Sequence, residues 1–293
     1  MTILWSGLTT GAIYALVACG YNLILVSSGV LNFAQGAIVM FGGFMGYVAV
    51  SNWGLPGPVA ILFGIAIGFG VGLFNELLAI RPLHWATKGR QAEGHTELVT
   101  TVGYATVLIG VAGVLWGVNA LRVEFPGANT TIEFLGGRLF PLQLAIIGSA
   151  VAVGVGLHFW ATKTRWGLAS LAVAEDRVAA SARGINVTFL SLLSFAMAGA
   201  LAGGVGVLTA PITFATTGLG NALALSGFVA IAIGGLGSQL GSTLGGFFIG
   251  LVAAFSARYI GASYQDIAIF VLLLLTLMFR PGGLGSSVKA RSV

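Results

Sequence analysis

"LWSGLTTGAIYALVACGYNLIL" occupies residues 4–25 and contains no charged side chain. A helix that crosses the hydrocarbon core of a bilayer needs about 20 consecutive, largely apolar residues. This stretch is long enough, and no basic segment precedes it as one would in a cleavable signal peptide. The sequence therefore predicts that it stays in the protein as a membrane-spanning helix.

The rest of the chain has the same character. Hydrophobic residues make up 57% of the 293 residues and charged residues 7%, against about 25% charged in an ordinary soluble domain. That leaves too little polar surface to cover a soluble domain. The 46 glycines suit close helix packing in lipid, where small residues let backbones approach. The predicted fold class is an all-α polytopic membrane protein, with residues 1–293 forming a single transmembrane domain.

Nine segments are apolar enough to span, so we expect a bundle of about eight to ten transmembrane helices. The shorter segments are compatible with broken or tilted helices. The nine are 5–26, 33–50, 57–80, 97–118, 141–162, 187–210, 222–238, 243–258 and 266–280.

Basic residues predict the orientation, because cytoplasmic loops are enriched in Lys and Arg. Of the 13 basic residues, three lie in 81–96, four in 163–186 and three from Arg280 onward. Even numbers of spans separate these stretches, so all three fit the cytoplasmic side. The N-terminus then lies outside if the first two segments both span fully. The loop 119–140 faces outward, and its alternation with Pro-Gly and Gly-Gly pairs predicts a small hairpin or cap.

A short motif occurs twice. "SSGVLN" (27–32) and "TTGLGN" (216–221) share two hydroxyls, a glycine, two residues and an asparagine, and each precedes an apolar segment that reaches a Gly-Gly pair. Interrupted helices in related halves often mark the pathway of a transporter. In the orientation above the repeat is inverted, whereas an N-terminus inside would make it parallel.

Glycine pairs at i, i+4 place both glycines on one helix face, where a second helix can approach. They predict a compact bundle and say nothing of a substrate. The pairs are Gly42/Gly46, Gly64/Gly68, Gly68/Gly72, Gly113/Gly117, Gly199/Gly203 and Gly246/Gly250.

Polar residues within apolar segments need an internal partner or water. They either form hydrogen bonds between helices or contact a polar solute. The candidates for a translocation pathway are Asn22, Asn32, Gln35, Thr100, Thr101 and Asn221. Glu76, about a turn from the cytoplasmic end of its segment, is expected to reach water or Arg81. The deep spans hold no clear buried charge, which argues against coupling to an ion gradient.

No motif for catalysis occurs in the sequence: there is no GxxxxGK[ST] loop, GxSxG elbow or HExxH helix. The glycine-rich stretch 234–246 lacks the lysine of a phosphate loop and predicts a tight cytoplasmic turn. The single Cys19 excludes an intrachain disulfide, and the three histidines are scattered. We therefore expect no catalytic residue, no metal and no cofactor.

"KTRWGLASLAVAEDRVAASARGIN" (163–186) holds six of the chain's charged residues. Its Ala-rich, proline-free part favours a helix or helix pair too short and polar to span. Gly184 stands where a C-terminal cap is expected. A weakly apolar stripe follows three- and four-residue spacing through Leu168, Leu171, Ala174, Val178 and Ala182. Composition alone favours a solvated cytoplasmic helix on the membrane surface.

The same stretch resembles the cytoplasmic coupling loop in permease subunits of branched-chain amino acid ABC importers. The motif residues are Thr164, Arg165, Gly167, Ala174, Glu175, Asp176, Ala179, Ala180, Gly184 and Ile185. Further matches to the family follow in the same order along nearly the whole chain. They are "GVLNFAQGAIVMFGGF" (29–44), "RPLH" (81–84), "LVTTVGYATVL" (98–108) and "FRPGGLG" (279–285).

The resemblance implies a type II-like importer permease in the bacterial cytoplasmic (inner) membrane. It implies a second, similar or identical permease, two ATP-binding subunits and a periplasmic or extracellular solute-binding protein as partners, with membrane lipid around the bundle and no nucleic acid. ATP hydrolysis is expected only in a partner. The residues that couple to the ATPase are then Arg165, Gly167, Glu175, Asp176, Arg177, Arg183 and Gly184.

The family handles branched-chain and other amino acids, short amides and urea. The intramembrane amides suit a neutral or zwitterionic solute. The alternatives are a sugar permease of the ribose type, a secondary carrier that works alone, and a channel.

Overall fold

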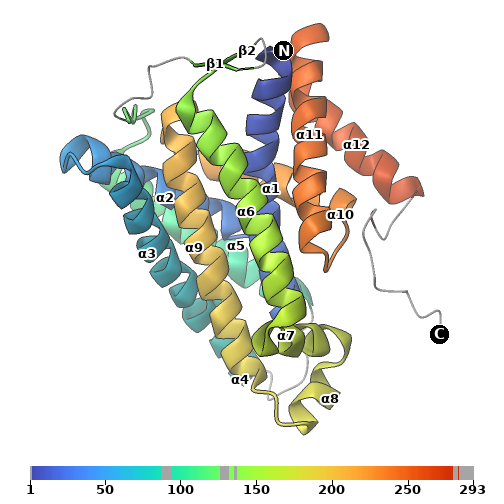
Figure 1. Cartoon of the computed structure of the whole chain (residues 1–293). Coiled ribbons are helices and arrows are strands. Elements are labelled where there is room, and N and C mark those ends of the chain that lie inside the picture. Colours follow the sequence, from blue (N-terminus) through green and yellow to red (C-terminus); the bar gives the residue numbers. More distant parts are fainter. Residues whose placement is uncertain (1, 87–93, 126–131, 135–136, 280–282, 284–293) are drawn as a thin grey trace. The chain divides into compact units, whose positions relative to one another are not determined.

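The computed structural model describes residues 2–86, 94–125, 132–134, 137–279 and 283 (Figure 1). The helices are α1 (Thr2–Ser28), α2 (Gln35–Tyr47), α3 (Gly57–Asn75), α4 (Arg81–Ala86), α5 (Gly94–Trp116), α6 (Pro141–Lys163), α7 (Arg165–Glu175), α8 (Arg177–Ala182), α9 (Val187–Thr213), α10 (Leu219–Gly234), α11 (Gln239–Tyr259) and α12 (Gln265–Phe279). Two π-helical turns, η1 (Val48–Asn52) and η2 (Glu76–Ile80), extend α2 and α3, and a 3₁₀ turn, η3 (Ala262–Tyr264), precedes α12.

Each of the nine apolar segments coincides with one of these helices, so the predicted helical membrane protein is confirmed. Within the described residues, seven helices are long and apolar enough to cross a membrane. The predicted segments 33–50 and 222–238 are not among these seven: α2 has 13 residues and is extended by the five of η1, and α10 has 16. Both end near glycines with positive φ, Gly54 and Gly235, where the chain turns.

The predicted hairpin in the loop 119–140 is also present. Strand β1 (Ile132–Phe134) pairs antiparallel with β2 (Gly137–Leu139), with Ile132 opposite Leu139. Earlier in the same loop, Arg122 and Glu124 form an exposed ion pair at 3.3 Å.

The chain forms two compact units, each assembled from separate parts of the sequence. Unit 1 comprises residues 1–22, 127–159 and 225–293, and unit 2 comprises 23–126 and 160–224. Helices α1, α6 and α10 each contribute residues to both units.

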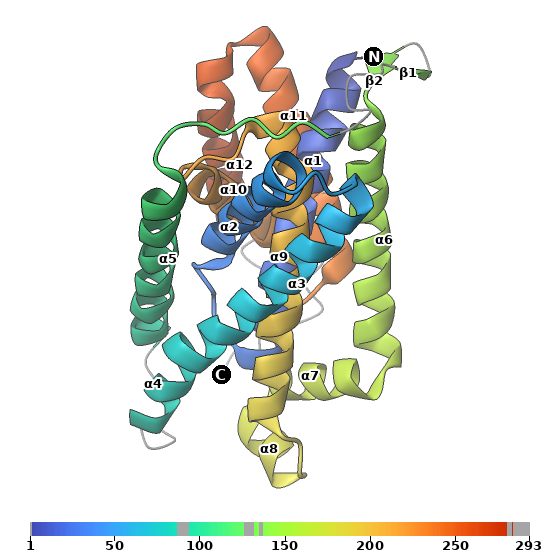
Figure 2. The ribbon, with the colours of Figure 1, turned by 90° about the vertical axis from the view of Figure 1, so that its left-hand side faces the viewer.

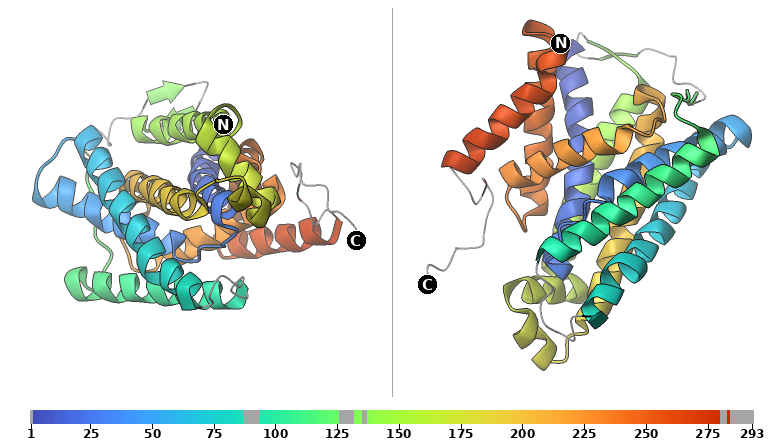
Figure 3. Two further views of the ribbon diagram at one scale, coloured as in Figure 1. Left: turned by 90° about the horizontal axis from the view of Figure 1, so that it is seen from below. Right: turned by 180° about the vertical axis from the view of Figure 1, so that it is seen from behind.

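In unit 2, α9 packs against α3 through glycines, and the two helices cross in Figures 2 and 3. A Cβ atom added at Gly68 would overlap the carbonyl oxygen of Gly199, and one at Gly203 would overlap that of Gly64. Residue numbers rise on α3 as they fall on α9, so the helices are antiparallel. Close backbone contact of this kind needs residues without a side chain.

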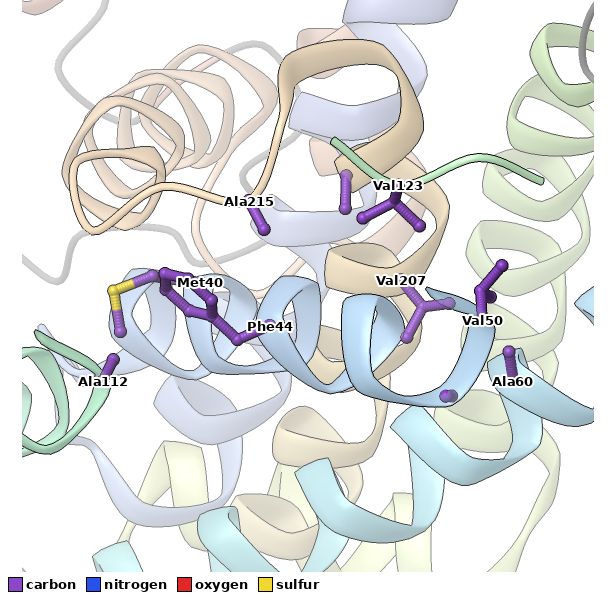
Figure 4. Packing of buried hydrophobic residues seen from close by; sticks show 10 residues of the cluster. Met40, Phe44, Val50, Ala60, Ala112, Val123, Val207 and Ala215 are labelled. Atoms are coloured by element: carbon purple, nitrogen blue, oxygen red, sulfur yellow. The ribbon is translucent and has the colours of Figure 1, made fainter. Parts of the chain in front are cut away.

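Helix α2 packs on α9 in the same unit. A Cβ at Gly42 would lie 2.6 Å from the carbonyl oxygen of Gly203. The apolar cluster around this crossing is drawn in Figure 4, where Phe44, Met40 and Val207 lie among side chains from several elements. Phe44 also stacks on Trp116 of α5, with ring centroids 5.1 Å apart.

In unit 1, α1 packs against α11 through a second glycine contact. The backbone of α1 at Gly11 and Ala15 approaches Gly250 and Gly246 so closely that no Cβ fits at either α11 position. Gly234 and Gly241 meet across the turn from α10 to α11, which confirms the tight turn predicted for 234–246. Gly113 and Gly117 differ from the other predicted pairs, since neither has an atom within 4 Å of its Cβ position.

The motif that occurs twice in the sequence, at 27–32 and 216–221, corresponds to a structural repeat. Each copy follows a 27-residue helix, α1 or α9, and leads into a shorter helix, α2 or α10, and then a long one, α3 or α11. The break after α1 is bonded to α8, just before α9 begins, whereas the break after α9 is paired at Ala215 with Leu121. A 27-residue helix is about 40 Å long, so the breaks lie at opposite ends of α9. The repeat is therefore inverted.

Candidate functional site: a charged helix pair and a buried amide cluster

A sharp corner joins α6 to α7, and its residues explain the Thr-Arg-x-Gly sequence. Thr164 is the N-cap of α7: its hydroxyl accepts from the Gly167 backbone N–H at 3.1 Å and donates to the Trp160 carbonyl at 2.7 Å. A Cβ at Gly167 would overlap the backbone of Trp160 and Ala161. Glycine is needed there so that α7 can fold back against the end of α6.

Asp176 separates α7 from α8 and starts the second helix. Its carboxylate oxygen Oδ1 accepts from the backbone N–H groups of Val178 and Ala179, both at 2.9 Å, as an N-cap residue does. Gly184 has φ +84° just after the last turn of α8, which confirms the cap expected there. The predicted helix is thus a pair of helices, with α7 lying across the start of α9 (Figure 2).

The stripe of Leu168, Leu171, Ala174, Val178 and Ala182 does not form the buried face of this pair. Leu168 is 51% exposed and Val178 is 75% exposed. The buried face is formed instead by Val173 and Ala180, which pack on Leu190 of α9. The three- and four-residue spacing therefore does not identify the face that packs on α9.

The charged side chains of the helix pair are exposed, except for that of Arg177. Arg165, Glu175, Asp176 and Arg183 are exposed, whereas Arg177 is partly buried. The Nη1 of Arg177 donates to the backbone carbonyl of Ser28, the last residue of α1, at 3.3 Å. The pair therefore presents charged and apolar side chains to its surroundings and is joined to the break between α1 and α2.

A buried polar group, the amide cluster, lies where α2 begins, in the same unit. It consists of Asn32, Gln35 and Asn75, all at most 1% exposed. Asn75 Nδ2 donates to Asn32 Oδ1 at 2.9 Å, and Gln35 Nε2 donates to the Ala198 carbonyl of α9 at 3.1 Å. Residues from α3, from α9 and from the break before α2 thus converge on one point.

Two hydroxyl residues border the amide cluster. Thr101 of α5 accepts from the Phe33 backbone N–H at 3.3 Å. The register of α3 on α9 predicts that Ser191 of α9 lies near the level of Asn75, since Gly68 faces Gly199 and Gly72 faces Phe195 one turn further on. Both hydroxyl residues are buried.

Each amide of the cluster uses only one of its two ends. Asn32 Nδ2, Asn75 Oδ1 and Gln35 Oε1 have no hydrogen-bond partner among the described residues, and neither does Ser191 Oγ. Leaving a buried polar atom unpaired costs about 1–3 kcal/mol. The cluster therefore retains an unused donor and unused acceptors, as a polar solute carrying both kinds of group would require.

Glu76 lies next to the cluster and is only 2% exposed. Of the two contacts expected for it, water or Arg81, contact with water is wrong, because η2 carries it into the interior beside α9 and α5. The expectation that the spans hold no clear buried charge is wrong for Glu76 as well.

The other predicted pathway residues lie elsewhere. Asn22 belongs to unit 1, where its amide donates to Ser242 Oγ at 3.1 Å and accepts from the Gly237 N–H at 2.8 Å, so it holds the turn before α11. Asn221 is exposed near the start of α10, and Thr100 donates to the Glu97 carbonyl of its own helix. Only Asn32, Gln35 and Thr101 of the six meet.

Asn75 was not predicted for the site. Ser191 is not among the six candidates, although, as a polar residue within an apolar segment, it was open to either bonding between helices or contacting a solute. One feature of the sequence could have pointed to Asn75: it is the first polar residue after a long apolar run in α3. Ser191 had only its place one turn from Ser194. Among the described residues no group of three or more His, Cys, Asp or Glu could hold a metal ion, and Cys19 is a free, buried thiol.

Comparison with known proteins decides the family. The family model for the branched-chain amino acid transport system permease component matches residues 3–277. The chain belongs to this family. The resemblance drawn from the coupling-loop and Asn-Phe-Ala-Gln-Gly motifs is thus confirmed.

Relatives of this permease match over most of their length. The high-affinity branched-chain amino acid transport permease BraD of Pseudomonas aeruginosa is 30% identical over 95% of this chain and 93% of its own. LivH of Escherichia coli K12 is 27% identical over 96% and 94%. The fructose import permease FrcC of Rhizobium meliloti is more distant, at 24% identity over 91% of this chain and 73% of its own.

The fold of the permease also occurs in a solved structure. PsaBC from Streptococcus pneumoniae in complex with Fab superposes with a TM-score of 0.51, covering 96% of this chain and 93% of that chain at 14% identity. Its family and the apolar helices among its described residues make the chain a multi-pass membrane protein of a bacterial transporter family.

Proposed function

We propose that this permease forms the translocation path for branched-chain amino acids in an ABC importer of the bacterial cytoplasmic membrane. The match over residues 3–277 carries the proposal. Two ATP-binding subunits, and not this chain, hydrolyse the ATP that drives transport. A second permease completes the path, and a solute-binding protein delivers the amino acid from outside.

The helix pair α7–α8 is the proposed docking site for an ATP-binding subunit. Its exposed carboxylates and its exposed Leu168 and Val178 offer both charge and apolar area to a protein partner. The corner at Gly167 and the caps at Asp176 and Gly184 keep the pair rigid, so a push on it is passed to the long helices α6 and α9.

The amide cluster is the proposed polar point of the path. An amino acid zwitterion carries N–H donors and carboxylate acceptors, which match the unused amide ends of Asn32, Asn75 and Gln35. A urea or short-amide solute has the same two kinds of group, so uptake competition must separate them.

The first experiment is to tag the chain, solubilise native membranes gently and identify the proteins that co-purify. Recovery of an ATPase and a second permease is the expected result. Recovery of this chain alone, in a detergent that keeps known ABC complexes intact, would contradict the proposal and favour a self-sufficient carrier or channel.

Two further measurements separate the alternatives. Glu175→Arg, which reverses an exposed charge and leaves the Asp176 cap in place, should strongly lower uptake with normal membrane insertion, whereas a carrier or channel would be unaffected. Competition of labelled leucine uptake by unlabelled leucine, urea and ribose, in cells holding all subunits, should show leucine alone competing. Competition by ribose would favour a sugar permease.

A further inference from the structure

The backbone of Arg177 belongs to α8, and its side chain bonds to the end of α1. Arg177 is the first residue of α8, directly after the cap Asp176, and its side chain reaches the carbonyl of Ser28. That carbonyl is among the last four of α1, which have no partner within the helix. The negative end of the helix dipole favours a cation at this point. Arg177 thus fixes the end of α1 to α8.

The chain turns immediately beyond this contact. Gly29 has φ +76°, a conformation that L side chains rarely adopt, and its N–H bonds to the Leu25 carbonyl at 2.9 Å. No atom lies within 4 Å of its Cβ position, so the need for glycine comes from the backbone angle and not from packing.

Only three residues separate Ser28 from Asn32, the first residue of the amide cluster. Between them the Val30 N–H donates to Ser28 Oγ at 3.2 Å, and just beyond them Asn32 Oδ1 accepts from the Ala34 N–H at 3.1 Å. These local bonds stiffen the segment. A shift of Ser28 is therefore carried to Asn32, whose Oδ1 also holds Asn75.

We propose that Arg177 is the positioning residue through which the α7–α8 pair controls the amide cluster. The inference rests on the proposed function, since the bound ATP-binding subunit supplies the motion. Displacing α8 draws Ser28 with it and separates Asn32 from Asn75. The unused amide atoms favour this separation, because they gain hydrogen bonds once water or solute enters.

The test compares Arg177→Gln, Arg177→Lys and Lys163→Gln in the complete transporter. Lys163→Gln is the matched control, because it removes one positive charge from an exposed position just before the same helix pair. For each variant one measures co-purification of the ATPase, ATP hydrolysis in membrane vesicles and leucine uptake.

Arg177→Gln should retain the ATPase and its hydrolysis while uptake falls at least tenfold, so that less solute is moved per ATP. Arg177→Lys, which keeps a cationic donor, should restore part of the uptake, and Lys163→Gln should match the wild type. Unchanged uptake in Arg177→Gln would overturn the proposal. Loss of the ATPase from Arg177→Gln would also overturn it, because Arg177 would then serve in docking. Absence of an ATPase from the wild-type preparation would instead contradict the proposed function.

A double-mutant comparison guards against a general loss of structure. If Arg177 acts through the amide cluster, the uptake losses of Arg177→Gln and Asn32→Ala should not multiply in the double variant. Fully multiplicative losses would mean that the two residues act independently, and would refute the link.

Discussion

At the scale of single residues, glycines decide which helices touch. Gly68 and Gly70 lie on the same helix, two positions apart, yet only Gly68 faces a neighbouring backbone. The sequence shows a glycine at both positions, and their different environments follow from the direction each faces.

Gly68→Ala should therefore destabilise the protein, because the added methyl group meets the carbonyl of Gly199 and forces the helices apart, at a cost typical of overpacking, about 1–3 kcal/mol. Gly70→Ala is the control: nothing lies within 4 Å of its Cβ position, and alanine is the better helix former. The thermal midpoint of each variant in detergent checks this. An equal change in both would contradict the glycine contact.

A second comparison at this scale concerns the corner between α6 and α7. Gly167→Ala should lower both the thermal midpoint and leucine uptake, since the methyl group overlaps the backbone at Trp160. Gly156→Ala, in the preceding helix α6 and with no atom within 4 Å of its Cβ position, should change neither. Wild-type uptake in Gly167→Ala would show that the corner tolerates a wider angle.

At the scale of elements, α8 has only six residues. A helix this short is not stable by its own propensity. It depends on its cap, on Gly184 at its other end and on Ala180 packing against Leu190.

Asp176→Ala should therefore loosen α8, because it removes the acceptor for Val178 and Ala179, and caps of this kind contribute about 0.5–2 kcal/mol. Asp176→Asn keeps an acceptor oxygen and should behave nearly as the wild type. Amide hydrogen exchange over residues 177–183 measures the effect. Equal protection in the alanine and asparagine variants would argue against the cap.

At the scale of the whole molecule, helices from one copy of the inverted repeat pack on helices from the other copy. The first helix of each copy packs on the third helix of the other: α9 on α3 in unit 2, and α1 on α11 in unit 1. Each compact unit therefore draws on both copies, which explains why the units are discontinuous in sequence.

The orientation of the chain gives a prediction at this scale. In a Cys19→Ser background, Val178→Cys should react with a membrane-impermeant maleimide only after the inner side of the membrane is made accessible. Ser263→Cys, in η3 between α11 and α12, should react from outside. Cys19 itself is buried and should stay unlabelled. Labelling of both introduced cysteines from one side would reverse the assignment by basic residues.

The sequence by itself determined the membrane environment, the nine helical segments, the family and a short helical stretch at 163–186 that could be one helix or two. These follow from local properties: apolar length, charge placement, capping residues and motifs that lie within a few positions of each other. It also predicted the repeat from six residues. It allowed the shorter segments to be broken or tilted but did not fix where the helices of α2 with η1 and of α10 end, because the turns that follow depend on backbone angles at single glycines.

Only the tertiary structure decided which polar residues meet. Asn22, Asn32 and Asn75 look alike along the chain, yet Asn32 and Asn75 bond to each other, whereas Asn22 fastens a turn in the other unit. The glycine register of α3 on α9 sets that pairing. A register between two distant helices depends on how their surfaces fit, and no local pattern encodes it.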